Sequence, residues 1–328
     1  MNVDRQITID ANRLSLDQAL ALRTPEISPL EVADLINRFT KGVSELLQNR
    51  YEQRELRVTK DKIRRVLRCE RNLVESQRSK DKPTPAMVVG TLLDACFSIH
   101  ASGGEIEDPS EDALSFISTL GEVLEIDHEV KDQVRAKVEE GYLKLTAFWD
   151  TKATSERFSL RLQDRIAISF DNGRLQLIGR PDLVLSDLDP NHQTVIVIDV
   201  KSGTPKYFDV EDAHLYALME TLRSRRPPSL IGNYYLALDR LDLITTSLKL
   251  LDDEAKRTLA AIAKMIEIAQ AKSATPTRSV ELCQFCPVNS TCEEVTDDDR
   301  LGWTPIEAPI SNDSEIQAPI EDKASVDD

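Results

Sequence analysis

Two short motifs place acidic and basic side chains where neighbouring strands are expected to meet. The first is GRPD at residues 179–182, and the second is DVK at residues 199–201, which begins 17 residues after Asp182. Asp199 and Lys201 are two residues apart, so on a strand both side chains point to the same face of the sheet. Asp182 belongs to the preceding antiparallel strand and can come alongside them.

This combination of side chains suits a particular chemistry. Two carboxylates at one strand end repel each other unless a cation joins them, and Mg²⁺ or Mn²⁺ prefers such oxygen ligands. A neighbouring lysine can orient the attacking water of a phosphodiester hydrolysis and offset the charge of its transition state. The competing interpretation is a chance Asp-x-Lys at a strand end, tied up in a surface ion pair.

Cysteines form a second group of reactive side chains. Cys283, Cys286 and Cys292 are separated by two and five residues, and the sequence has two other cysteines, Cys69 and Cys96. A disulfide framework is not expected in a reducing cytosol. Thiolate sites bind zinc or an iron–sulfur cluster, and the spacing favours neither. Unrelated buried cysteines are the third interpretation.

One further carboxylate stands out because of its apolar surroundings. Asp94 lies in the helical stretch GTLLDA at residues 90–95. Burial of a carboxylate is costly unless the group is paired or metal-bound, which makes Asp94 a candidate ligand. Alternatively, the helix is amphipathic and Asp94 lies on its solvent side.

Composition sets the class of protein. The 328 residues include 41% hydrophobic and 30% charged residues, with a net charge of −16, as in globular proteins. The start lacks the pattern of a signal peptide, and no stretch reaches the roughly 20 apolar residues of a membrane helix. We therefore expect a soluble cytoplasmic protein without a membrane partner.

The charge is unevenly distributed. Residues 293–328 contain 12 acidic and two basic residues, whereas residues 50–82 contain 12 basic and six acidic residues. The acidity is thus mostly a property of the C-terminal tail, and it does not exclude a polyanionic partner for the basic segment. The alternative for the basic segment is a solvated helix face.

The order of patterns predicts how these residues are positioned. Residues 1–150 form an N-terminal region, mostly helical from residue 28, and residues 151–295 form a core with alternating strand patterns. The Asp-Asn-Gly sequence at 171–173 predicts a two-residue hairpin turn. Two further predictions are central strands at 195–198 and 233–238, with the first buried on both faces. Asp209 is expected to cap the next helix, the last helix stops before Pro276, and residues 296–328 form an acidic disordered tail.

In this order, the features resemble the PD-(D/E)XK nuclease superfamily and, more closely, its RecB-like branch. That branch includes the CRISPR-associated RecB-like exonucleases and the AddB-type nuclease domains with iron–sulfur clusters. The resemblance covers Leu67–Cys292, from the first cysteine through the Asp94 helix and the two strand motifs to the cysteine triplet. It implies an α/β fold with a restriction-endonuclease-like core. In such a core a mixed central β-sheet is flanked by helices, here with the N-terminal helical region and a C-terminal iron–sulfur clasp.

The resemblance also implies roles for individual residues. Asp182, Asp199 and Lys201 are the implied catalytic residues. The implied ligands of Mg²⁺ or Mn²⁺ are Asp94, Asp182, Asp199 and the carbonyl of Val200. A four-iron four-sulfur cluster is implied at Cys69, Cys283, Cys286 and Cys292, with zinc as the alternative, and Cys96 remains an ordinary buried thiol.

Two positions depart from the pattern of the branch. Asp94 stands where the branch usually has histidine. In the Gln-x3-Tyr pair that follows the lysine, Tyr216 fits the pattern and Asp212 replaces the glutamine. Residues four apart share a helix face, so Asp212 and Tyr216 are expected to line the site.

The implied function is a metal-dependent DNA nuclease. We expect a single-strand-preferring exonuclease that acts in DNA repair, recombination or CRISPR and mobile-element processing. The basic segment is expected to bind DNA phosphates through Arg64, Arg65, Arg68 and Arg71. The acidic tail either shields this surface or binds a protein partner. The alternative is a catalytically silent iron–sulfur subunit that binds DNA or supports a larger nuclease or helicase complex.

Overall fold

A computed structural model describes residues 6–10, 27–50, 55–79, 84–120, 124, 126, 128–148, 156–188 and 194–296. The tail predicted for residues 296–328 lies outside this part of the chain except for its first residue. No helix of the described residues is both long and apolar enough to cross a membrane.

Helices make up most of the first half of the described chain and also follow the later strands. They are α2 (Pro29–Arg50), α3 (Lys60–Arg68), α4 (Glu70–Arg78), α5 (Pro85–Ala101), α6 (Pro109–Thr119), α7 (Lys131–Phe148), α9 (Tyr207–Ser224), α10 (Leu248–Ala271) and α11 (Val280–Cys283). The prediction that the last long helix stops before Pro276 agrees with the end of α10.

The strands form two sheets. They are β1 (Gln6–Asp10), β2 (Leu56–Thr59), β3 (Phe158–Leu162), β4 (Ile166–Phe170), β5 (Leu175–Gly179), β6 (Leu183–Asp187), β7 (Val195–Lys201), β8 (Leu230–Tyr235) and β9 (Arg240–Thr245). The larger sheet has the order β1-β9-β8-β7-β6-β3, and the smaller has the order β2-β5-β4. Both are mixed, because β7 pairs in parallel with β8 and β2 pairs in parallel with β5.

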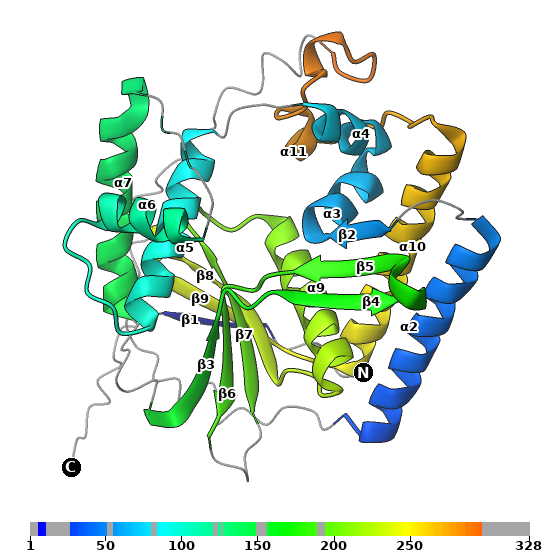
Figure 1. Cartoon of the computed structure of the whole chain (residues 1–328), viewed down its shortest axis with the longest axis horizontal. Coiled ribbons are helices and arrows are strands. Elements are labelled where there is room, and N and C mark those ends of the chain that lie inside the picture. The colour runs from blue at the N-terminus through cyan, green and yellow to red at the C-terminus, as the bar shows by residue number, and fades with distance from the viewer. Residues whose placement is uncertain are drawn as a thin grey trace, which may run out of the picture.

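Helices cover the larger sheet on both faces. Figure 1 shows α5, α6 and α7 on one side, with α2, α9, α10 and the small sheet on the other. Successive strand residues point to opposite faces, and Val197 accordingly joins one hydrophobic cluster while Ile196 and Ile198 join the other. The β-branched run at 195–198 is therefore part of a strand with two buried faces, as predicted. This mixed sheet with flanking helices is consistent with a restriction-endonuclease-like core.

The hairpin predicted around Asn172 is present, but its turn is longer than expected. Strands β4 and β5 pair from Ile166↔Gly179 to Phe170↔Leu175, which leaves four residues between them rather than two. Asp171, Asn172 and Gly173 all have positive φ, at 47°, 55° and 87°, and they form a short 3₁₀ turn. Asn and Gly tolerate this backbone conformation, so the sequence predicts the place of the turn but not its length.

Three local predictions differ from the structure. Residues 236–238 of the predicted strand at 233–238 form a 3₁₀ turn after β8. Asp209 helps to cap α9 as predicted, but from the third residue of the helix rather than from the N-cap position, since its carboxylate accepts a hydrogen bond from the backbone N–H of Lys206 at 2.8 Å. The N-terminal region also contains β1 and β2. Their partners, β9 and β5, lie far along the chain, so local periodicity did not reveal them.

Candidate active site

Asp182 joins the two strand motifs. It lies directly before β6, and its Oδ2 accepts a hydrogen bond from the backbone N–H of Val200 in β7 at 2.7 Å. Gln163 donates from its side chain to Asp182 Oδ1 at 2.7 Å and from its backbone to the Asp182 carbonyl at 3.0 Å. Asp182 is only 7% exposed. Both carboxylate oxygens are therefore fixed by strand geometry.

Asp199 and Lys201 lie on the same face of β7, and a second lysine joins them. Lys201 Nζ lies 2.5 Å from Asp199 Oδ2, and Lys60 Nζ lies 3.3 Å from the same oxygen. Asp199 is 2% exposed. Burial alone would raise the pKa of this carboxyl, but the charges of Lys60 and Lys201 lower it below its ordinary value. Asp199 is therefore ionised.

The pKa values of the other two acids are shifted in the opposite direction. Burial, followed by the charges of Asp199 and Asp94, raises the pKa of Asp182 well above its ordinary value. Burial and the charge of Asp199 raise the pKa of Asp94 to about 7. Ionisation of all three acids together is therefore costly without a further positive charge. A divalent cation would compensate this charge, so the oxygen donors of these acids fit Mg²⁺ or Mn²⁺.

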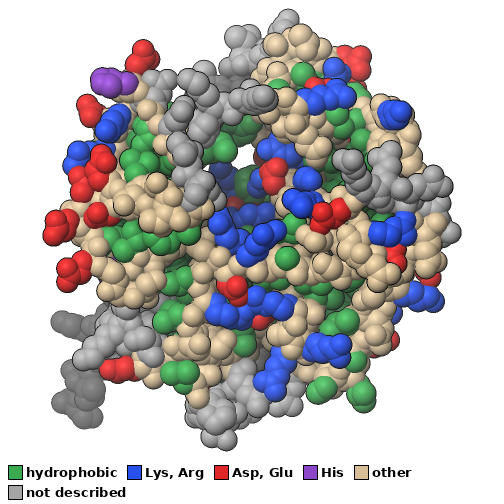
Figure 2. All heavy atoms as spheres, viewed as in Figure 1, with side chains coloured by type: hydrophobic (Ala, Val, Ile, Leu, Met, Phe, Trp, Pro, Cys, Tyr) green, Lys and Arg blue, Asp and Glu red, His purple; other side chains and the backbone are tan. Residues whose placement is uncertain are grey.

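A pocket of about 210 Å³ opens beside these groups. Asp94 lines it from α5, Val200 and Lys201 from the end of β7, and Phe208 and Asp209 from the start of α9. Figure 2 shows Lys and Arg side chains gathered around a hollow near the middle of this face of the molecule. Asp94, Val200 and Lys201 thus meet at one opening, whereas Asp182 and Asp199 lie behind its lining.

The metal site is not preformed in the described part of the chain. No group of three or more His, Cys, Asp or Glu side chains there is arranged to hold a metal ion. Asp94, Asp182 and Asp199 are nevertheless close enough for their charges to shift one another's pKa values. The three acids therefore interact electrostatically, but their oxygen atoms do not converge on a single point where an ion could bind.

Asp212 and Tyr216 both lie on the side of α9 that faces these residues. Asp212 Oδ2 lies 3.5 Å from Lys201 Nζ and 3.7 Å from Lys60 Nζ. The Tyr216 hydroxyl donates a hydrogen bond to the Arg180 carbonyl at 3.0 Å. Asp212 is therefore paired with two bases rather than left as an unbalanced charge.

Gly179 allows α9 to approach the first motif closely. A Cβ atom at this position would lie 2.8 Å from Met219 Sδ and 3.0 Å from a ring carbon of Tyr216. Real Cβ contacts are essentially never as short as the first, so a larger residue would require the end of the Met219 side chain to shift and would crowd the Tyr216 ring. The glycine of the first motif thus has a packing role that places Tyr216 beside Arg180.

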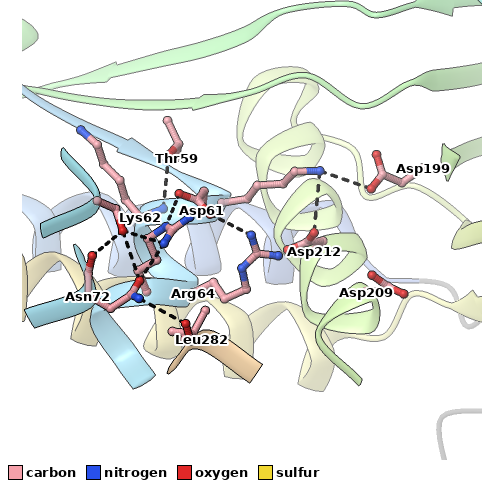
Figure 3. A network of polar contacts seen from close by, with 12 residues as sticks. Thr59, Asp61, Lys62, Arg64, Asn72, Asp199, Asp209, Asp212 and Leu282 are labelled. Atoms are coloured by element: carbon pink, nitrogen blue, oxygen red, sulfur yellow. Dashed lines mark hydrogen bonds and ion pairs between the residues drawn. The ribbon is translucent and has the colours of Figure 1, made fainter. Parts of the chain in front are cut away.

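Lys60 is a site residue that the sequence analysis did not identify. It follows β2, whose parallel pairing with β5 places Thr59 opposite Ile178. Thr59 caps α3, and Lys60 is the first residue of that helix. Lys60 Nζ lies 3.3 Å from Asp199 Oδ2 and 3.7 Å from Asp212 Oδ2, and Figure 3 shows these two acids side by side near one end of α9. The available signal was the basic segment itself, because Lys60 belongs to it.

Four cysteines line one small pocket at the other end of α3. Cys69 lies between α3 and α4, whereas Cys283, Cys286 and Cys292 come from the segment that begins with α11. Figure 1 shows α11 beside α4. Cys96 lies in α5, apart from this pocket, and burial raises the pKa of its thiol to about 12. The structure thus separates the four predicted cysteines from the fifth.

Backbone N–H groups point at two of these sulfur atoms. The amides of Asn72 and Thr277 each donate to Cys69 Sγ at 3.4 Å, and the amide of Ser279 donates to Cys283 Sγ at 3.3 Å. Such hydrogen bonds stabilise thiolates that ligate metals or clusters. The four thiols and these donors have the chemistry that a thiolate-bound metal group requires. The described thiols are not, however, arranged to hold a metal ion.

Two of the predicted DNA-binding arginines stack on aromatic rings at the start of α9. The Arg64 guanidinium lies 4.7 Å from the centre of the Phe208 ring, and that of Arg68 lies 4.7 Å from the centre of the Tyr207 ring. Arg68 also pairs with Glu211 at 2.9 Å. Tyr207 is 51% exposed. Phe208 also lines the pocket at Asp94, and the Tyr207 hydroxyl donates a hydrogen bond to Glu281, two residues before Cys283.

The other two arginines have more internal roles. Arg65 donates to Asp61 at 2.6 Å and to both Asn72 and Ser76 at 2.7 Å, so it connects α3 to α4. Arg71 lines the cysteine pocket. All four predicted arginines are half-buried.

Comparison with protein families identifies the superfamily to which the chain is similar. A family model described as the PD-(D/E)XK nuclease superfamily matches residues 57–293. This range includes Lys60, the two strand motifs and the four cysteines of the small pocket. No curated protein matches the chain.

Proposed function

The chain belongs to the PD-(D/E)XK nuclease superfamily, and we propose that it is a Mg²⁺- or Mn²⁺-dependent deoxyribonuclease. The observation that carries this proposal is the hydrogen bond from the Val200 amide to Asp182, beside the Asp199–Lys201 ion pair. It holds the two acids and the lysine of the superfamily motif together near one opening.

Each residue has a distinct role in the proposed reaction. Asp94, Asp182, Asp199 and the carbonyl of Val200 would hold the cation. When bound, this cation supplies a Lewis acid for the scissile phosphate and lowers the pKa of the attacking water. Lys201 donates a hydrogen bond that orients the water and offsets the charge that develops on the phosphate oxygens. Asp212 and Tyr216 position Lys201 and the first motif.

We further propose a single-strand preference and exonuclease action in the cytoplasm, in DNA repair, recombination or CRISPR and mobile-element processing. The order of the motifs supports this, since it resembles the RecB-like branch. The exposed ring of Tyr207 beside Arg68 also supports it, because aromatic and cationic side chains together bind unpaired bases and their phosphates. Arg64, Arg65, Arg68 and Arg71 remain the proposed DNA-binding residues, with Arg65 acting mainly by holding α3 against α4 through Asn72 and Ser76.

The cysteine pocket is proposed to hold a four-iron four-sulfur cluster, with zinc as the alternative. The support is that Cys69, Cys283, Cys286 and Cys292 line one cavity. Protein purified without oxygen separates the two groups: a cluster gives a brown protein with broad visible absorption, and zinc gives a colourless one. In either case the group would join α4 to the segment after α10 and limit the entropy of the unfolded chain.

The acidic tail is proposed to shield the basic segment or to bind a protein partner. Its charge, opposite to that of residues 50–82, supports the first role. Deletion of residues 296–328 is expected to raise DNA affinity at low salt if the tail shields this surface. Loss of a co-purifying protein would instead support partner binding, and no change in either measurement would contradict both roles.

The nuclease proposal is tested with end-labelled and circular single-stranded DNA, each with Mn²⁺ and with Mg²⁺. Metal-dependent loss of the end-labelled strand with an intact circle supports an exonuclease, whereas opening of the circle supports an endonuclease. DNA binding without cleavage in either metal would favour the catalytically silent subunit. This second function is supported by Asp94 and Asp212, which stand where the RecB-like branch usually has histidine and glutamine.

A further inference from the structure

Two lysines contact the same carboxylate oxygen of the proposed nuclease site. Lys201 comes from β7 itself, and Lys60 comes from the start of α3, 139 residues before Asp199 in the chain. Lys201 lines the pocket beside Asp94, and Lys60 is absent from its lining. The Lys60 side chain is 33% exposed, compared with 3% for the Asp199 side chain. Lys60 therefore reaches the site from the α3 side and keeps contact with solvent.

Backbone pairing fixes this position. The register of β2 on β5 places Thr59 beside Ile178, and the first motif begins at the next residue of β5. The Thr59 hydroxyl accepts a hydrogen bond from the Lys62 amide at 3.4 Å, which starts α3 at Lys60. The pairing of β2 with β5, the cap at Thr59 and the start of α3 thus place Lys60 beside the site.

Lys60 also contacts the residue that departs from the pattern of the RecB-like branch. Its Nζ lies 3.7 Å from Asp212 Oδ2, while Lys201 Nζ lies 3.5 Å from the same oxygen. A buried carboxylate without a base would repel a phosphate group strongly. Lys60 and Asp212 together carry no net charge, as would the neutral glutamine usual at that position.

We propose that Lys60 binds a phosphate oxygen of the substrate strand on the α3 side of Asp199, with Asp212 holding its ammonium group in place. The inference rests on the proposed function, and it adds a substrate-binding residue from outside the superfamily motif. Lys60 and the metal ion compete for Asp199 in the absence of DNA. With DNA bound, Lys60 would pair with the phosphate and release Asp199 from this competition.

This assignment predicts two effects of opposite sign for Lys60→Met. Mn²⁺ binding to the protein without DNA, measured by calorimetry, is expected to tighten by about three- to tenfold, because a positive charge next to Asp199 is removed. The KM for a single-stranded oligonucleotide is expected to rise by about tenfold, with kcat changed less than threefold. A purely structural role would not tighten metal binding while it weakens substrate binding.

Matched variants separate the effect of the Lys60 charge from effects of the substitution on folding. Lys62→Met removes a lysine of the same helix, whose ammonium group donates to the Arg57 carbonyl at 2.9 Å, and is expected to leave both quantities unchanged. Lys60→Arg keeps the charge and is expected to keep KM within about threefold of the wild type. Lys60→Met/Asp212→Asn removes both charges and is expected to reverse most of the increase in KM caused by Lys60→Met.

The outcomes distinguish this inference from the proposed function. A wild-type protein that neither binds Mn²⁺ nor cleaves DNA overturns the proposed function. An active wild type with unchanged Mn²⁺ affinity and KM in Lys60→Met overturns only the role of Lys60. Should Lys60→Met fail to fold, as judged by circular dichroism, the same two quantities are measured in Lys60→Gln, with the same expected signs.

Discussion

The Asp182 carboxylate accepts a hydrogen bond from the backbone N–H of Val200 at 2.7 Å. Val200 lies between Asp199 and Lys201, so this contact fixes the first acid against the strand that carries the other two residues. The Gln163 side chain holds the second oxygen of Asp182 at 2.7 Å. The site is therefore built on rigid strands, as the alignment of acids with a phosphate requires.

Replacement of Asp182 tests the proposed metal site. Asp182→Asn keeps an oxygen that can accept from Val200 but removes a charge that a divalent cation requires, so Mn²⁺ affinity is expected to fall at least about tenfold. Calorimetry of the folded variant measures this. Asp164→Asn is the control, because Asp164 pairs with Arg161 and Arg223, and equal Mn²⁺ binding by wild type and Asp182→Asn would contradict the assignment.

Replacement of one cysteine tests the proposed metal group. Cys283→Ser is expected to remove the visible absorption, or the bound zinc, and to lower the Tm by several degrees, because the link between α4 and α11 is lost. Elemental analysis and thermal unfolding measure the two effects. Cys96→Ser is expected to retain the full metal content, since Cys96 lies outside the pocket. A metal-free wild type would refute the prediction.

Two arginines of one helix are expected to behave differently. Arg65→Gln breaks the contacts from α3 to Asn72 and Ser76, so the free energy of unfolding is expected to fall by about 1–2 kcal/mol, with little change in DNA affinity. Arg68→Gln is expected to weaken DNA binding and to reduce its salt dependence by about one counterion. Binding titrations at several salt concentrations measure this, and the reverse pattern would contradict it.

The Asp61 carboxyl gives a prediction for pH. Burial opposes ionisation of this group, but hydrogen bonds and charges from Arg65 and Arg64 outweigh that cost and lower the pKa of Asp61. The carboxyl therefore contributes to stability above its unfolded pKa of about 4. This contribution is lost as the pH falls through the folded pKa.

Thermal unfolding from pH 6 to pH 3 measures the contribution of Asp61. The difference in Tm between wild type and Asp61→Asn is expected to be constant above about pH 5 and to shrink at lower pH. Glu45→Gln is a suitable control, because Glu45 forms an exposed pair with Lys41 at 3.7 Å. A difference that grows with acidity would contradict the sign of the shift.

Local pattern predicted much of the fold. The β-branched run that includes Ile196 and Ile198 predicted a central strand, and the Asn172-Gly173 pair predicted a hairpin. Strands β1 and β2 were not predicted, because each is short and takes its stability from a partner far along the chain. The length of the turn at Asp171 also depends on the pairing register of β4 and β5, which local propensity does not determine.

In the candidate site, too, some residues were predicted from local sequence, whereas others depend on contacts between distant parts of the chain. Residues two apart on one strand, such as Asp199 and Lys201, were placed together by parity alone. Lys60 could not be placed, because its position depends on the parallel register between β2 and β5, and parallel pairing leaves no short-range sequence signal. Gln163 was missed for a similar reason, since its role arises from a contact with Asp182 across 19 residues.

The most direct test of the central claim is cleavage of an end-labelled single strand by wild type and Lys201→Met with Mn²⁺. The account predicts metal-dependent cleavage by the wild type and a fall of at least about 100-fold in kcat for the variant, with DNA affinity kept within about threefold. Undiminished cleavage by Lys201→Met would contradict the claim that Asp182, Asp199 and Lys201 form the reacting site.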